Sequence, residues 1–201
     1  MASTAPSVEA SAVDARQLAR RLLRTRLLAD RVGFAGRPQA PPAHDALAAH
    51  LARLLRDIEP GQLGVYWPIR SEFNAITALE AAGPPKLRLA LPFATRLPPE
   101  MHYRAWDGRT PTGIDECGLP APSEGPVVVP DVILVPCVGY TRSGFRLGYG
   151  AGYFDRWLEQ HPQTTAIGIA WSIGEISDED FAPQAHDLPM RVVLTEQGVV
   201  V

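Results

Sequence analysis

One uninterrupted run of apolar residues constrains the fold more than any other feature of the sequence. Residues 132–138 read Val-Ile-Leu-Val-Pro-Cys-Val, with no charged or amide side chain among them. A strand with one face in water would alternate apolar and polar residues, whereas a strand of a parallel sheet is covered on both faces. The run therefore predicts a sheet that is buried between two layers of helices.

Other strands and helices are expected to alternate around this run. Apolar stretches typical of strands lie at residues 63–67, 87–93, 101–107, 131–140, 164–171 and 191–195. Leucines or other apolar residues at helical spacing lie at residues 15–32, 44–58, 72–81 and 153–161. This order predicts an α/β fold: a single three-layer domain over residues 15–201, with a mainly parallel, Rossmann-like sheet and helices on both faces. Ligands of such folds bind beyond the carboxyl ends of the strands.

Two segments are expected to lie outside this framework. Residues 1–14 are small and polar, without the apolar run of a signal peptide, and we expect a disordered extension there. Residues 110–130 are dense in Gly and Pro and predict a long irregular loop at the surface.

Charge and cysteine content exclude several classes of partner. The formal net charge is -3 and the sequence pI is about 5.9, which argues against a nucleic-acid partner. No apolar stretch is long enough to span a bilayer, so no membrane partner is expected. Cys117 and Cys137 form no CxxC pair, which favours a reducing, cytoplasmic location. The chain is expected to be a monomer that binds small molecules.

A glycine-rich segment follows the apolar run. Gly148, Gly150 and Gly152 alternate just before the expected helix at residue 153. Glycines let backbone N–H groups approach a phosphate, and a helix start adds partial positive charge. Arg146 precedes the glycines, and Asp155 follows where a carboxylate can reach Mg²⁺. A plain tight turn is the alternative, because the segment lacks the Gly-Lys-Ser/Thr of a P-loop.

Residues 136–158, PCVGYTRSGFRLGYGAGYFDRWL, resemble the signature of the 5-formyltetrahydrofolate cyclo-ligase family. Three other segments are similar to family elements in the expected order: Arg-Arg-Leu-Leu-Arg at residues 20–24, Tyr-Trp-Pro-Ile-Arg-Ser-Glu at 66–72, and His-Asp-Leu-Pro at 186–189. The resemblance implies an ATP-dependent ligase that uses Mg²⁺ to convert 5-formyltetrahydrofolate to 5,10-methenyltetrahydrofolate. ATP and a reduced folate are the small molecules that it implies.

The resemblance also implies roles for individual residues. The catalytic residues it implies are Arg146 and Tyr153, and the metal ligands are Asp155 and Asp187. The folate site would comprise Trp67, Glu72, Tyr149 and Tyr153. The ATP site would comprise Arg20, Arg24, Arg146, Leu147, Gly148, Tyr149, Gly150, Ala151, Gly152, Tyr153 and Phe154.

Several of these residues have alternative interpretations. Arg20 and Arg24 lie in an arginine-rich helix, where a solvated face is the ordinary reading. Glu72 and Asp155 could simply favour helix starts. Trp171 indicates only packing.

Three positions depart from the family pattern: Ala151 replaces a lysine or glycine, Phe154 replaces a tyrosine, and Arg191 replaces an acid. These departures leave two alternatives open. One is a non-catalytic paralogue that binds folate or nucleotide, and the other is an α/β enzyme acting on a different phosphorylated small molecule.

Overall fold

Helices and strands alternate along most of the chain. The computed structural model describes residues 8–82, 87–181, 183–184 and 187–201. Its helices are α1 (Val8–Ala35), α2 (Ala40–Ile58), α3 (Ala75–Ala82), α4 (Tyr153–Gln160) and the 3₁₀ turn η1 (Ser172–Gly174). Its strands are β1 (Leu63–Gly64), β2 (Leu89–Ala94), β3 (Met101–Trp106), β4 (Gly113–Ile114), β5 (Pro120–Ala121), β6 (Val127–Val128), β7 (Val132–Pro136), β8 (Gly139–Tyr140), β9 (Arg146–Leu147), β10 (Thr165–Ile169), β11 (Val192–Thr195) and β12 (Gly198–Val199).

The main sheet has eight strands in the order β12-β11-β10-β7-β1-β2-β3-β6. Strands β11, β10, β7, β1 and β2 are parallel, and antiparallel strands extend both edges. Leu63 of β1 is in register with Leu89 on one side and Val132 on the other. From β1 the chain first adds β2 outward, and then returns to add β7, β10 and β11 on the opposite side. The boundary between β1 and β7 is thus the topological switch point, where ligands of such sheets bind.

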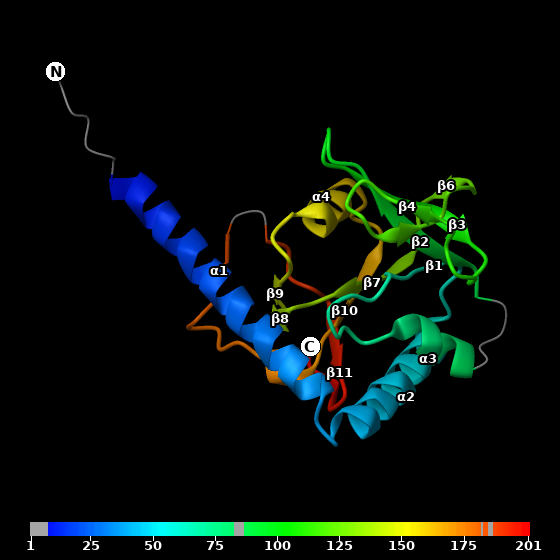
Figure 1. The fold of residues 1–201 in the computed structure, drawn as a ribbon, viewed down its shortest axis with the longest axis horizontal. Helices are drawn as coiled ribbons and strands as arrows, with labels where there is room; N and C mark the ends of the chain where they lie inside the picture. Colours follow the sequence, from blue (N-terminus) through cyan, green and yellow to red (C-terminus); the bar gives the residue numbers. More distant parts are fainter. Residues whose placement is uncertain (1–7, 83–86, 182, 185–186) are drawn as a thin grey trace.

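Helices cover both faces of this sheet (Figure 1). α2 and α3 cover one face through a large apolar cluster that includes Leu47, Leu51 and Ile167. α4 covers the other through Trp157 and Leu158, which pack in a second cluster. The prediction of a mainly parallel sheet with helices on both faces is therefore confirmed.

The long helix α1 packs by its C-terminal half and projects beyond the body by its N-terminal half (Figure 1). Leu27 of α1 is buried in a small cluster with Val138, Leu147 and Ile176. These residues lie beyond the ends of β7 and β10, so α1 lies at the carboxyl edge of the sheet. The helix begins at Val8, so residues 8–14, which we expected to be disordered, are helical. Residues 1–7 lie outside the described part.

Three local predictions need correction. The strand expected at residues 63–67 pairs as β1 only over Leu63–Gly64. The helix expected from residue 72 begins at Ala75, where the Asn74 side chain accepts a hydrogen bond from the N–H of Thr77. The segment 110–130 contains the short strands β4, β5 and β6, of which β6 joins the main sheet beside β3.

Candidate active site

The glycine loop 148–152 leads from β9 into α4 and lies against α1. Arg24 of α1 donates a hydrogen bond from Nε to the carbonyl oxygen of Gly148, over 2.7 Å. Gly150 and Gly152 have φ values of 95° and 70°, in the region that favours glycine. A Cβ at Gly150 would also lie 3.2 Å from the Arg24 guanidinium, whereas a Cβ at Gly148 would meet no atom within 4 Å. The loop is therefore tightly held at Gly150 and open at Gly148.

Two arginine–aspartate pairs flank this loop. Arg146, buried at the start of β9, pairs with Asp155 in the first turn of α4. Arg20 of α1 pairs with Asp187 through both carboxylate oxygens. The structure thus pairs each of two arginines expected to bind phosphate with one of the two expected metal ligands. Burial lowers the pKa of Arg24, and the positive charge of the nearby Arg20 lowers it further.

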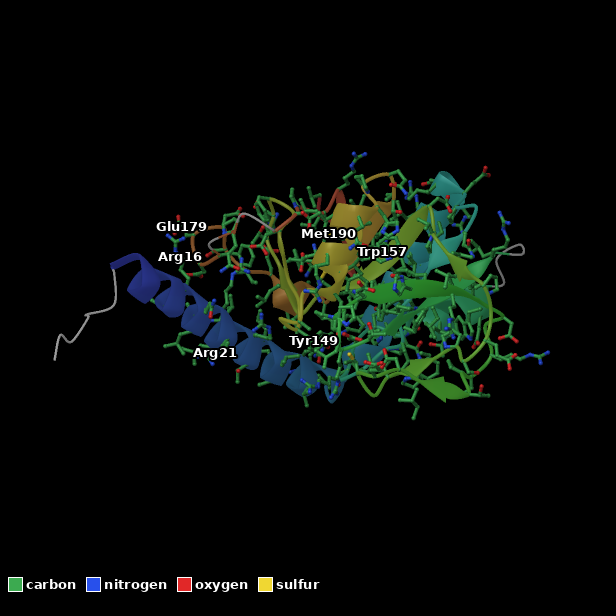
Figure 2. All side chains as sticks on the ribbon, turned by 90° about the horizontal axis from the view of Figure 1, so that it is seen from above. Arg16, Arg21, Tyr149, Trp157, Glu179 and Met190 are labelled. Atoms are coloured by element: carbon green, nitrogen blue, oxygen red, sulfur yellow. The ribbon has the colours of Figure 1, made fainter. Side chains whose placement is uncertain are left out.

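The second pair joins residues that are far apart in the sequence. The projecting half of α1, marked by Arg16, runs alongside the segment that carries Glu179 (Figure 2). Arg20 bridges the two segments, and its guanidinium lies 4.7 Å from the ring centroid of Phe181. Arg20 therefore joins helix α1 to the segment after β10.

The donor chemistry suits Mg²⁺ better at Asp155 than at Asp187. Mg²⁺ in nucleotide sites is held by one or two carboxylates together with phosphate oxygens. No group of three or more His, Cys, Asp or Glu side chains suited to a metal occurs within the described ranges. The Asp155 side chain is 28% exposed beside the loop. Both oxygens of Asp187 already accept hydrogen bonds, from Arg20 and from the backbone N–H of Gln184.

A buried network links the glycine loop to the turn after β1. The hydroxyl of Tyr149 donates a hydrogen bond to Oε1 of Glu72 over 2.6 Å and accepts one from Arg31. Figure 2 shows Tyr149 beside α1, which carries Arg31. The side chains of Glu72 and Arg31 are only 3% and 4% exposed. This network joins the expected nucleotide loop to the expected folate ligand Glu72 at the switch point.

Burial sets the acidity of this network. Desolvation raises the pKa of Glu72, opposed by hydrogen bonds from Tyr149 and the N–H of Ile69 and by the charges of Arg31 and Arg70. The pKa of Tyr149 is raised as well, first by desolvation and then by the charge of Glu72. Tyr149 is therefore a hydrogen-bond donor that keeps its proton.

The two other expected folate residues, Trp67 and Tyr153, lie on opposite faces of the sheet. Trp67 packs against the apolar cluster on the α2–α3 face, and Tyr153 packs against the cluster on the α4 face. The Tyr153 hydroxyl donates to the carbonyl of Thr95, just beyond β2, over 2.9 Å. The thiol of Cys117 lies 3.2 Å from the same hydroxyl. Tyr153 is therefore anchored at the carboxyl edge, beside the glycine loop.

Comparison with known proteins decides the family. A model of the 5-formyltetrahydrofolate cyclo-ligase family matches residues 16–196. The chain belongs to this family. A 5-formyltetrahydrofolate cyclo-ligase of Mycolicibacterium smegmatis is 41% identical over 83 residues, which cover 41% of each chain. One of Mycoplasma pneumoniae is 35% identical over 68 residues, 33% of this chain and 40% of that protein. The matched stretches thus span about two fifths of these curated relatives.

Solved structures agree with the family at the level of the fold. The 5,10-methenyltetrahydrofolate synthetase of Aquifex aeolicus superposes with a TM-score of 0.73 at 25% identity, over 90% of this chain and 91% of that one. The synthetase of Mycoplasma pneumoniae superposes with a TM-score of 0.65 at 21% identity, over 88% and 98%. The cyclo-ligase fold therefore extends over nearly all of this chain.

Three further residues of the expected ATP site differ in how far they are buried. Leu147 is a fully buried strand residue, and its carbonyl oxygen already accepts a hydrogen bond from the N–H of Val138. The exposed Ala151 accepts a hydrogen bond from Arg156 through its carbonyl oxygen. Phe154 is half-buried against the α4 cluster. His186, part of the C-terminal family element, lies outside the described residues.

The sequence did not indicate two residues that hold the surroundings of Glu72, Arg31 and Trp171. Arg31 is one of several arginines in α1, and its helical spacing alone does not separate it from its solvated neighbours. Trp171 was expected only to pack, but its indole N–H donates to the carbonyl oxygen of Ser71 over 3.0 Å. Both contacts join segments far apart in the sequence, so no local pattern indicates them.

Among the described helices, none has both the length and the apolar character needed to cross a membrane.

Proposed function

We propose that this chain uses MgATP to convert 5-formyltetrahydrofolate to 5,10-methenyltetrahydrofolate, with release of ADP and phosphate. Family membership supports the reaction class. The observation that carries the proposal for this chain is the hydrogen bond of Tyr149 to Glu72, which connects the glycine loop to a buried carboxylate at the switch point. We further propose that the protein acts in the cytoplasm as a monomer, on small molecules, and without a nucleic-acid or membrane partner.

The chemistry must make a formyl oxygen into a leaving group. The formyl oxygen attacks the γ-phosphorus of ATP, the bond to the β–γ bridging oxygen breaks, and ADP leaves. N10 then attacks the formyl carbon and loses its proton. The carbon–oxygen bond breaks and phosphate departs with the former formyl oxygen. Transfer of this kind depends mainly on positioning and on charge stabilisation, and no strong base is required.

Arg146, Arg20 and Arg24 would supply the positive charge for the phosphates. Arg146 and Arg20 are held in place by aspartates in the structure, so nucleotide phosphates would take over from carboxylates as their partners. The open side of Gly148 would let a phosphate oxygen reach the backbone. Asp155, released by Arg146, would hold Mg²⁺, and Asp187 is the second proposed ligand. Bound there, Mg²⁺ would neutralise charge on the phosphates.

Glu72, Tyr149 and Tyr153 would form the folate side, and Trp67, on the other face of the sheet, is the fourth proposed contact. A buried carboxylate discriminates strongly for a ligand that donates hydrogen bonds, and the amino-pyrimidine edge of a pterin is such a donor. Tyr149 would orient this carboxylate from the loop. Tyr153 offers an aromatic face at the start of α4. Tyr153 is also the proposed catalytic partner of Arg146.

The test is a turnover assay with purified protein. We expect the absorbance of a methenylfolate to appear only when 5-formyltetrahydrofolate, ATP and Mg²⁺ are all present. Omission of each component in turn is the control. Tight folate binding without turnover would favour a non-catalytic paralogue, and absence of ATP binding would favour a different α/β enzyme.

Alanine substitutions at two loop glycines should separate folding from nucleotide binding. Gly150→Ala should lower the free energy of unfolding by roughly 1–3 kcal/mol, because φ of 95° is unfavourable for alanine. Gly148→Ala should leave thermal stability unchanged, because its Cβ meets no protein atom. It should still weaken MgATP binding about tenfold or more, by blocking a charge-assisted backbone hydrogen bond to phosphate. Thermal unfolding and calorimetry measure the two effects, and unchanged MgATP affinity in Gly148→Ala would exclude the open side as a phosphate site.

Folate affinity should rise with pH over the range just above 4.5, the ordinary pKa of a glutamate. Burial raises the pKa of Glu72 in the free protein, and pterin N–H donors favour the carboxylate over the acid. Affinity is therefore low where Glu72 is protonated and levels off above its raised pKa. Arg31, Arg70, Tyr149 and the buried Tyr66 face this carboxylate. The pKa values of both tyrosines are raised, so neither phenol loses its proton in that range. Calorimetry across this range should show the rise in the native protein, and Glu72→Gln should abolish it.

A further inference from the structure

The turn that carries Glu72 has a strained backbone. Arg70 and Ser71 have φ values of 48° and 63°, so two successive residues other than glycine adopt the left-handed conformation. Such conformations are unfavourable and persist only where the surrounding structure holds them. Since Glu72 is the next residue, the direction of its carboxylate depends on whatever holds this turn.

Side chains from two distant segments hold the turn. Arg31 of α1 donates from Nε to the carbonyl oxygen of Arg70, over 3.0 Å. Trp171, just beyond β10, donates from its indole N–H to the carbonyl oxygen of Ser71, also over 3.0 Å. Each left-handed residue therefore has its own external donor. The turn itself adds hydrogen bonds only between Ile69 and Glu72.

Both donors are themselves fixed. The Trp171 ring packs against Phe34 and Phe73, with centroid distances of 5.4 and 5.9 Å. The guanidinium of Arg31 also donates to the Tyr149 hydroxyl, and its Nη1 lies 4.0 Å from Oε1 of Glu72. Arg31 thus contacts the turn, the carboxylate and the loop tyrosine at once.

We propose that Arg31 and Trp171 are positioning residues for folate binding, which fix the strained turn so that the Glu72 carboxylate keeps one orientation. This inference rests on the proposed role of Glu72 as a folate ligand. Neither residue needs to touch the substrate, because both act through the turn. A planar guanidinium serves three partners here in a way that a lysine ammonium cannot.

Trp171→Phe gives the cleanest test, because it keeps an aromatic side chain and removes the N–H donor. Its dissociation constant for 5-formyltetrahydrofolate should rise about fivefold, in the range expected for loss of one buried hydrogen bond. The dissociation constant for MgATP should change less than twofold. Trp106→Phe is the matched control, because the Trp106 indole donates a similar hydrogen bond to the carbonyl of Arg109, at the end of β3 away from this turn. Equal effects of the two variants on folate affinity would overturn the proposal.

Arg31 is tested by a pair of variants. Arg31→Met should weaken folate binding more than Trp171→Phe does. Arg31→Lys should weaken it less than Arg31→Met, because the lysine ammonium keeps a positive charge near Glu72. If Arg31→Met fails to fold, which thermal unfolding reports, the Trp171→Phe result alone decides. Folate affinity that is unchanged in Trp171→Phe would contradict the inference.

A double-mutant cycle separates this inference from the proposed function. If the positioning residues act through Glu72, Trp171→Phe should have no further effect on folate affinity in a Glu72→Gln background. An equal effect in both backgrounds would refute positioning through Glu72 and indicate general packing. If Glu72→Gln alone leaves folate affinity unchanged, the proposed folate role of Glu72 fails first.

Discussion

Arg146→Ala should lower turnover about a thousandfold, the effect typical of removing an arginine that stabilises a transferring phosphoryl group. Arg146 is the most buried of the proposed phosphate ligands, and it holds Asp155 and the carbonyl oxygen of Leu188. Its loss would remove charge from the phosphate site and leave Asp155 without its partner. Arg146→Lys should recover only a small part of the activity, because one ammonium cannot replace the guanidinium fork. Steady-state kinetics with saturating MgATP measures the effect.

Arg142→Ala is the matched control for this variant. Arg142 lies in the same β8–β9 hairpin, but its side chain is 73% exposed and pairs with Glu175 at the surface. Surface pairs of this kind contribute roughly 0–1 kcal/mol to stability, so turnover and unfolding should change little. Arg146→Ala itself should be destabilised by roughly 1–3 kcal/mol, because it leaves polar groups without partners. A folded Arg146→Ala protein with near-normal turnover would remove Arg146 from the catalytic site.

Glu72→Gln should reduce kcat/KM for the folate about ten- to a hundredfold, mainly through a higher KM. The change keeps the size of the side chain and removes the charge that strengthens hydrogen bonds to the pterin, a difference of roughly 1.5–3 kcal/mol. KM for ATP should remain within about twofold, because the arginines around the loop are untouched. Initial rates with each substrate varied in turn separate the two KM values.

Glu124→Gln supplies the control, since Glu124 is an exposed residue between β5 and β6. It should leave both KM values unchanged. If Glu72→Gln raised KM for ATP as much as KM for the folate, Glu72 would be a general structural residue and the folate assignment would be wrong. Unfolding curves of both variants exclude loss of folded protein as the cause.

The sequence predicted the parts of this fold that depend on local patterns. The apolar run at residues 132–138 predicted a strand buried on both faces, and β7 has that position in the sheet. The alternation of strands and helices predicted the mainly parallel arrangement. Strand order was not predicted, because the order depends on the directions in which the connections cross the sheet.

Site residues were predictable where a motif identifies them. The loop at residues 146–155 brought Arg146 and Asp155 into one hypothesis, and the structure places them in contact. Arg31 was not predictable, because its contacts to Arg70, Tyr149 and Glu72 depend on how α1 packs against the sheet edge. The helix expected over residues 72–81 begins only at Ala75, so Glu72 lies in the turn before α3 and not in the first turn of the helix.

The fate of the formyl oxygen tests the central claim most directly. The purified protein is given 5-formyltetrahydrofolate labelled with ¹⁸O in the formyl group, together with ATP and Mg²⁺, and the released phosphate is analysed by mass spectrometry. Because the proposed reaction transfers the γ-phosphoryl group to that oxygen, we predict one labelled oxygen in each phosphate and one phosphate for each methenyltetrahydrofolate. Unlabelled phosphate accompanying methenyl product would contradict activation by phosphorylation of the formyl oxygen.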